Sequence, residues 1–313
     1  MSPVALPEVQ IDTRDTLSAA DHRALLAVLL AVALASLDTA IANTALPAIA
    51  ANLRATPAAS IWIVNAYQMA IVATLLPFAA LGDRWGPRKV FLGGLAFFTV
   101  SSLGCALADS LAALTFARTL QGVGASAIMS VNMALIRLIY PAHRLGRGVG
   151  LNALVVGVAF AIGPTVASLV LSVAGWPWLF AINVPLSVLC LAFGLPALPR
   201  SEPRPHGFDP ATAALTAITF SALILALGAA TQREDARWLA LSLLTAVVAG
   251  GLLLWRQAGH PAPMLPVDLL QRPLFALSAV TSVCAFATQG LVWCPCPSTS
   301  SRCCAATRCR PAS

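Results

Sequence analysis

Long stretches without a charged residue limit most strongly what this chain can fold into. A run of 18 or more apolar residues is enough for a helix across a hydrocarbon core of about 30 Å. Only 10% of the 313 residues are charged, whereas soluble domains carry about 25%. We therefore expect an all-α polytopic membrane protein, and the composition disfavours a soluble enzyme, a nucleic-acid binder and a disulfide-rich secreted protein. The uncharged stretches are residues 55–82, 90–108, 119–136, 148–199, 210–232 and 238–255.

Turn formers and charges divide the apolar sequence into nine predicted spans. The stretch 148–199 is too long for one span, and Gly175-Trp176-Pro177-Trp178 supplies a break whose indoles suit a membrane interface. Residues 1–21 are polar and lack the apolar core of a cleavable signal, so the first apolar segment is predicted to be the first span. The predicted helices are 24–46, 61–81, 89–108, 110–136, 148–172, 177–198, 211–231, 238–255 and 273–293.

The distribution of basic residues predicts which end of each span faces the cytoplasm. With the N-terminus inside, only Arg54, Arg233 and Arg237 fall on outer connections before the C-terminal tail. The inner segments are much richer in basic residues, as the positive-inside rule requires. The net charge of +7 then reflects topology rather than an acidic polymer as partner. The inner basic residues are Arg14, Arg23, Arg84, Arg88, Lys89, Arg137, Arg144, Arg147, Arg200, Arg204, Arg256 and Arg272.

Two ionisable side chains lie inside predicted spans, and each must be compensated. Asp38 is predicted to be a proton or cation acceptor facing a water-filled cavity, and the alternative is an acid near a helix end that reaches the interface or caps a neighbour. Arg118 cannot lose its proton and must face protein or water. Because the estimated depths of the two residues differ by a few ångströms, we expect them to interact for proton coupling. The alternatives are a static charge pair and separate partners for each residue. Gln121 could orient Arg118 by hydrogen bonding.

Two further motifs indicate places where helices bend or join. The segment GDRWGPRK at 82–89 is a predicted gating loop with Asp83, Arg84, Gly86, Arg88 and Lys89. The cations could serve topology alone, and Asp83 could cap the next helix or pair with a basic residue that moves during gating. Gly163 and Pro164 predict a kink in the fifth helix, as a gate or as plain packing.

These motifs together resemble a known family. LDTAIANTALP (37–47), GDRWGPRK, RTLQGVGAS (118–126), GPTVAS (163–168) and WPWLFAINVP (176–185) are similar, in order and spacing, to the drug:proton antiporters of the major facilitator superfamily with fourteen spans. The resemblance implies proton-coupled efflux of amphipathic or cationic drugs across a bacterial inner membrane by alternating access. The implied partners are a lipophilic cation, protons and membrane lipid, with no nucleic acid, no enzymatic reaction and no cofactor besides the proton gradient.

The resemblance assigns roles to residues of this chain and also has departures. It makes Asp38 the first-helix acid and Arg118 the proton-coupling arginine. It also makes Asp83 and Arg84 the gating-loop charges, and Gly163 with Pro164 the antiporter kink. The departures, all to small residues, are Ala40, Ala79, Ala159 and Ala167-Ser168.

The expected organisation is a six-helix N-terminal bundle at 24–198, made of two three-helix repeats, plus three further helices. A cytoplasmic segment at 1–23 precedes the bundle, and a linker at 199–210 leads to an extra helix pair at 211–255 and to a loop with the ninth helix at 256–293. Nine helices, where the resemblance implies fourteen, suggest a truncated transporter. The alternatives are a non-transporting fragment and a facilitator porter for a small metabolite.

The tail at 294–313 changes composition abruptly and holds five of the eight cysteines. The spacing of Cys294, Cys296, Cys303, Cys304 and Cys309 lacks the paired arrangement of zinc sites, so no metal is predicted. An exported disulfide tail is one alternative, and an out-of-frame translation that ends a longer gene is the preferred interpretation.

Overall fold

The computed structural model describes residues 18–200, 210–232, 236–257 and 273–293, all of whose regular secondary structure is helical. The chain divides into two compact units, 1–259 and 260–313. The first unit holds α1 (Ala19–Asn52), α2 (Pro57–Trp85), α3 (Pro87–Ala106), α4 (Leu111–Ile139), a 3-10 turn (Ala142–Arg144), α5 (Leu145–Val173), α6 (Pro177–Ala181), α7 (Asn183–Ala197), α8 (Pro210–Gln232) and α9 (Ala236–Gln257). The second holds α10 (Pro273–Trp293).

Helices α1, α2 and α4 begin at side-chain caps. Ser18 and Asp21 form a reciprocal capping box at α1, so this helix starts five residues before the predicted position 24. The hydroxyls of Thr56 and Ser110 accept backbone N–H bonds at the starts of α2 and α4. Hydrophobic patterns locate only the membrane-spanning part of a helix, so α1 and α2 start at their polar caps, before the predicted positions 24 and 61.

The predicted division of the stretch 148–199 is confirmed. Helix α5 ends at Val173 and α6 begins at Pro177, while a single residue, Ile182, separates α6 from α7 within the sixth span. The two indoles of the connection differ from the expectation that both suit an interface: Trp178 is 63% exposed, but Trp176 is 5% exposed and donates from Nε1 to Asn52 Oδ1 at 3.0 Å.

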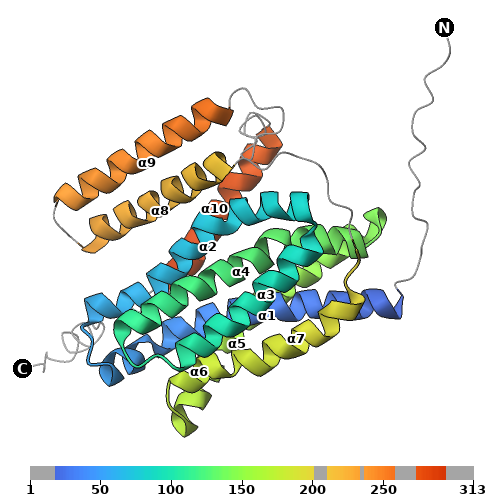
Figure 1. Ribbon diagram of the computed structural model, residues 1–313, viewed down its shortest axis with the longest axis horizontal. Helices are drawn as coiled ribbons and strands as arrows, with labels where there is room; N and C mark the ends of the chain where they lie inside the picture. The colour runs from blue at the N-terminus through green and yellow to red at the C-terminus, as the bar shows by residue number, and fades with distance from the viewer. Residues whose placement is uncertain (1–17, 201–209, 233–235, 258–272, 294–313) are drawn as a thin grey trace, which may run out of the picture. The chain divides into compact units, whose positions relative to one another are not determined.

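Helix α4 packs closely along α2 and α3, and α1 packs along α5 and α7 (Figure 1). Small residues permit this approach: a Cβ atom on Gly122 would lie 2.5 Å from the carbonyl oxygen of Tyr67, and one on Gly124 would lie 2.7 Å from the backbone nitrogen of Phe98. We call α1–α7 the α1–α7 bundle. Its buried apolar side chains form two clusters, one around Phe91, Phe98 and Leu135 and one around Ile49, Ile63 and Leu114.

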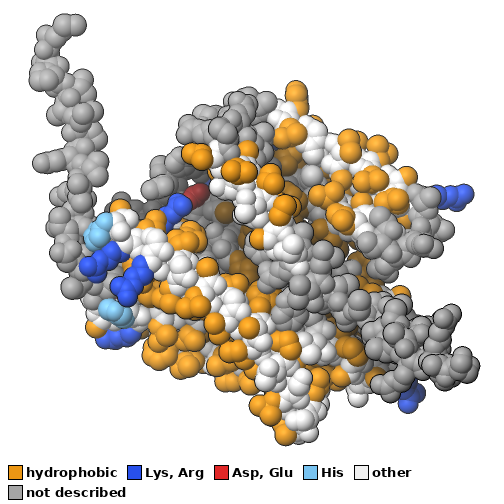
Figure 2. Space-filling model, turned by 180° about the vertical axis from the view of Figure 1, so that it is seen from behind, with side chains coloured by type: hydrophobic (Ala, Val, Ile, Leu, Met, Phe, Trp, Pro, Cys, Tyr) orange, Lys and Arg blue, Asp and Glu red, His pale blue; other side chains and the backbone are white. Residues whose placement is uncertain are grey.

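Helices α8 and α9 pack mainly against each other, and α8 also contacts α2. Within the described residues, eight helical spans are long and apolar enough to cross a membrane, with α6 and α7 counted as one, and α10 contributes a shorter apolar helix over Leu274–Ala285. Hydrophobic side chains cover much of the visible helical surface (Figure 2). The all-α membrane-protein fold class is therefore confirmed.

Candidate functional site

Asp38 lies in the middle of α1 and is 1% exposed. Its carboxylate accepts hydrogen bonds from three other side chains of the α1–α7 bundle. Oδ2 accepts from Arg118 Nη1 at 2.5 Å, and Oδ1 accepts from Gln121 Nε2 at 3.0 Å and from Asn183 Nδ2 at 2.6 Å. The acid neither reaches an interface nor caps a neighbouring helix.

Arg118 of α4 is completely buried and forms an ion pair with Asp38. The guanidinium carbon lies 4.0 Å from the ring centre of Tyr67 and 5.4 Å from that of Phe180, so α2 and α6 place aromatic faces against the cation. Its Nη1 also donates to Gln121 Oε1 at 2.6 Å. Its Nε and Nη2 have no hydrogen-bond acceptor among the described residues. The charge is thus neutralised by one carboxylate, while part of its donor capacity is unused.

Gln121 links the ion pair to α3. Its Nε2 also donates to Ser102 Oγ at 2.8 Å, and its Oε1 accepts from Cys105 Sγ at 3.4 Å. One turn of helix separates Arg118 from Gln121, so both side chains point to the same side of α4. Gln121 therefore contacts both members of the pair, as the hypothesis of an orienting role requires, although that role stays a prediction.

The structure brings Asp38, Arg118 and Gln121 together and adds residues that the sequence reasoning did not nominate. Asn183 contributes a direct hydrogen bond to Asp38 from α7, and Tyr67 covers Arg118 from α2. An isolated Asn inside an otherwise apolar span is a signal that could have identified Asn183, because such a side chain needs a partner in the membrane. Tyr67 gave no comparable signal. We call Asp38, Tyr67, Arg118, Gln121 and Asn183 the buried polar cluster.

Most of the predicted gating loop is helical. Asp83 and Arg84 belong to the last turn of α2, and Arg88 and Lys89 to the first turn of α3, which leaves Gly86 as the junction. Gly86 has φ 91°, a conformation that glycine adopts without strain. The alternative that Asp83 caps α3 is wrong, because Gly86 occupies the cap position and α3 has no side-chain cap.

Arg88 connects this junction to the sixth span. Its Nη2 donates to the carbonyl oxygen of Leu195 at 2.5 Å, near the end of α7. The helical donor for this oxygen would be residue 199, which is a proline without an N–H group. The basic residue is therefore a structural donor to the backbone as well as a topology signal. Lys89 and Asp83 are exposed.

The predicted kink lies against the helix that carries Asp38. Pro164 is inside α5, and Gly163 is buried at the crossing with α1, where an added Cβ would overlap the Cβ of Ala40. The two helices can approach this closely because position 163 has no side chain and position 40 has only a methyl group. The structure places Gly163 at a close helix crossing, and both the kink and its function as a gate stay predictions.

The comparisons agree with this architecture. The family model described as Major Facilitator Superfamily matches residues 28–296. The chain belongs to the major facilitator superfamily. This family consists of transporters, so the chain is part of an integral membrane protein.

Relatives of this facilitator chain include proteins with and without a described substrate. It is 50% identical over 275 residues to the uncharacterised transporter YebQ of Escherichia coli, covering 86% of this chain and 60% of that protein. It is 33% identical over 271 residues to the tetracenomycin C resistance and export protein of Streptomyces glaucescens, covering 85% and 50%. The chain therefore spans about half to three fifths of the length of these relatives.

A solved structure supports the fold. An auto-inhibited peptide transporter of the POT family superposes with a TM-score of 0.55 at 18% identity, covering 79% of this chain and 56% of that one. The described residues contain no group of three or more His, Cys, Asp or Glu side chains placed to hold a metal ion. The tail cysteines at 294–309 lie outside the described residues.

Proposed function

We propose that this facilitator chain takes part in proton-coupled efflux of amphipathic or cationic drugs across a bacterial inner membrane, with its N-terminus in the cytoplasm. In this proposal it belongs to the fourteen-span drug:proton antiporter branch, and α1–α7 form the two three-helix repeats of the N-terminal half. The observation that carries the proposal is the buried ion pair between Asp38 and Arg118, which joins α1 to α4.

The chemistry of the pair suits proton coupling because only one partner can titrate. Arg118 keeps its charge, whereas the Asp38 carboxylate can bind one proton and release it later. Protonation of Asp38 removes the negative charge that neutralises Arg118, and the guanidinium then needs a different acceptor or access to water. A proton that arrives from one side would thus weaken the bond between α1 and α4, and its release to the other side would restore it.

The direction and the substrate class rest on the family resemblance and on the relatives. A relative at 33% identity is named for resistance to tetracenomycin C and its export, and the motifs of 37–47 and 163–168 resemble those of drug:proton antiporters. In alternating access, two halves rock around a central site, so α1 and α4 of the α1–α7 bundle would respond to each proton. Positive charges at the end of the bundle that holds Arg84, Arg88, Arg144 and Arg147 support a cytoplasmic N-terminus.

The test is efflux of ethidium, a fluorescent lipophilic cation, from energised bacterial cells that express residues 1–313. In parallel, a chimera is made in which this chain replaces the matched segment of YebQ, so that YebQ supplies the rest of a full-length transporter. We expect efflux that stops when a protonophore collapses the proton gradient and that is abolished by Asp38→Asn, which keeps the shape but removes the titrating charge. The matched control is Asp109→Asn, an exposed acid in the α3–α4 connection.

The two forms separate the possible outcomes. Efflux by the chimera but not by residues 1–313 means that the chain acts only within a longer transporter. Gradient-dependent efflux that survives Asp38→Asn in the active form would rule out the proposed coupling role, and transport that is independent of pH would favour a porter for a small metabolite.

A further inference from the structure

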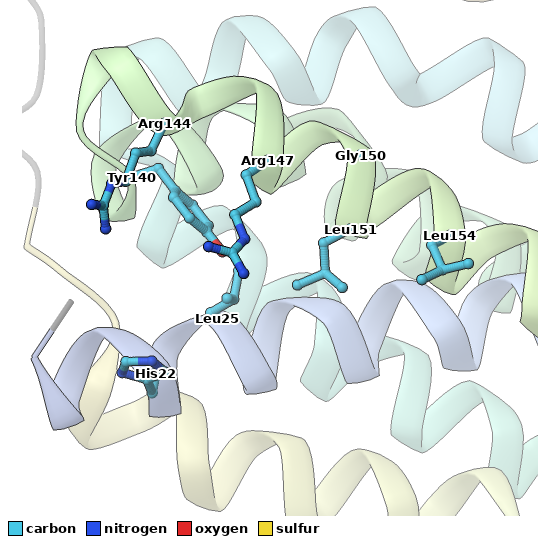
Figure 3. Close-up of a pocket in the computed structure, with 8 residues that line it drawn as sticks. All are labelled: His22, Leu25, Tyr140, Arg144, Arg147, Gly150, Leu151 and Leu154. Atoms are coloured by element: carbon cyan, nitrogen blue, oxygen red, sulfur yellow. The ribbon is translucent and has the colours of Figure 1, made fainter. Parts of the chain in front are cut away.

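A cavity of about 760 Å³ opens at the end of the α1–α7 bundle where α1 and α5 begin. Three basic side chains line it, His22 from the first turn of α1, Arg144 from the 3-10 turn and Arg147 from α5, together with the ring of Tyr140. Arg147 extends from α5 toward α1 beside that ring (Figure 3). The cavity therefore holds the positive charges of Arg144 and Arg147, one from the 3-10 turn and one from α5.

These basic groups are available for a ligand. Arg144 and Arg147 are exposed, and neither forms an ion pair or hydrogen bond with another described residue. His22 uses Nδ1 to donate to the carbonyl oxygen of Ser18 at 2.8 Å, which leaves its Nε2 without a described partner. The nearest acid in sequence, Asp21, is occupied by the backbone N–H and the hydroxyl of Ser18.

The basic cavity continues into an apolar groove. Leu154 lines both the cavity and a second hollow of about 410 Å³ formed by α1, α5 and α7, whose walls are apolar side chains such as Leu37, Val158 and Ile162. From Leu154 to Ile162 the groove follows α5 for about 12 Å at 1.5 Å per residue. It therefore extends from the charged end of the bundle toward the depth of Asp38, the neighbour of Leu37.

We propose that this cavity and groove bind one anionic phospholipid, with its phosphate at Arg144 and Arg147 and an acyl chain along the groove. The polar end selects a negative charge, and basic pockets between spanning helices on the cytoplasmic side suit such head groups. The apolar end offers contact area to a hydrocarbon chain but no hydrogen bonds. A water-soluble phosphate gains nothing from such apolar contact area. The lipid would bridge α1 and α5 beside the crossing at Gly163. This inference does not depend on the direction or the substrate of transport.

The test measures lipid binding to purified residues 1–313 in a neutral detergent. Dioleoyl phosphatidylglycerol, dioleoyl phosphatidylcholine and glycerol phosphate are each titrated, and the apparent affinity is obtained from the shift in thermal unfolding midpoint. Native mass spectrometry counts the bound lipids. We expect saturable binding of one phosphatidylglycerol and a much smaller effect of the other two probes.

Matched variants assign the binding to the cavity. At about 1 kcal/mol for each basic residue, the double variant Arg144→Gln/Arg147→Gln should lower the apparent affinity for phosphatidylglycerol by roughly tenfold or more. The control Arg137→Gln/Arg200→Gln removes two exposed charges that do not line the cavity and should change the affinity less than about twofold. Leu154→Gln should weaken phosphatidylglycerol binding as well. Unliganded midpoints equal to that of the parent chain show that the variants fold.

Three results would overturn the proposal. Equal stabilisation by phosphatidylcholine means that the groove takes any lipid, equal stabilisation by glycerol phosphate means a site for free phosphate, and equal losses in both double variants mean unspecific attraction to the basic end.

Discussion

Helices α4 and α9 show how little hydropathy says about the place of a span in this protein. The most apolar window of α9 is more hydropathic than that of α4, yet 61% of the α4 window is buried against 11% of the α9 window. Helix α4 carries Arg118 and Gln121 inward, where their side chains bond to α1 and α3. In α9, Ser242 and Thr245 donate to carbonyl oxygens of their own helix.

The difference in burial follows from the hydrogen-bond partners that the polar side chains of each helix require. A buried charge or amide in a membrane needs partners from other helices, whereas a hydroxyl can use the carbonyl one turn earlier. The buried polar cluster therefore binds α1, α4 and α7 into one arrangement, while the hydroxyls of Ser242 and Thr245 in α9 bond within their own helix. Substitutions in α4 and its partners should consequently cost far more than matched substitutions in α9.

The largest effect is expected at Asp38. Asp38→Ala leaves the buried Arg118 charge without its carboxylate, which should lower the free energy of unfolding by about 3–5 kcal/mol. The measurement is a denaturant titration in detergent micelles followed by circular dichroism. Ser242→Ala in α9 is the control and should stay within about 0.5 kcal/mol. The double variant Asp38→Ala/Arg118→Leu should recover much of the loss, and no recovery would show that the pair is not the cause.

A pair of glycine substitutions should change stability in opposite directions. Gly122→Ala places a methyl group 2.5 Å from the carbonyl oxygen of Tyr67, so the α2–α4 contact must widen at a cost of about 1–3 kcal/mol. Gly251→Ala in α9 has no atom within 4 Å of the added carbon and should gain about 0.5–1 kcal/mol from helix propensity. The same titration measures both, and a loss at both positions would contradict the packing contrast.

Asn183→Ala should cost about 1–2 kcal/mol, because Asp38 Oδ1 loses a donor at 2.6 Å. The matched control is Asn132→Ala, which removes an amide that bonds to the neutral side chain of Asn152 at 2.9 Å. Its cost should be smaller, about 0.6 kcal/mol. Thermal unfolding in micelles compares the two, and equal losses would mean that the charge of Asp38 adds nothing to its bond with Asn183.

The smallest effect is expected at Trp176. Trp176→Phe removes the Nε1–H donor to Asn52 but keeps an aromatic ring, at a cost of about 0.5–1.5 kcal/mol. Trp178→Phe changes a residue that is 63% exposed and should stay within about 0.5 kcal/mol. Unfolding midpoints test this, and the reverse order would show that the exposed indole stabilises the connection more.

Much of the fold could be predicted from residues such as Gly175 and Pro177, because turn formers and apolar runs act through neighbouring residues. The lengths of helices were predicted less well. Ser18 and Asp21 extend α1 beyond its hydrophobic pattern. Asp83 lies in the last turn of α2 and does not cap α3, because α2 continues to Trp85. Of the candidate site, Asp38, Arg118 and Gln121 could be nominated from the sequence, since an ionisable or amide side chain in a span needs a reason. Tyr67 could not, because an aromatic residue in a span is ordinary.

The sequence by itself determined that this protein lies in a membrane, where its spans are and which family motifs they carry, because hydropathy and turn chemistry are local. The sequence also suggested that Asp38 and Arg118 interact, but only the tertiary structure decided which further groups contact the pair. The partners of Asp38 lie 80, 83 and 145 positions away in the chain, and no local rule fixes a contact over such separations. Helix packing brings them together, since the close crossings at Gly122 and Gly163 set how near α4 and α5 come to their neighbours.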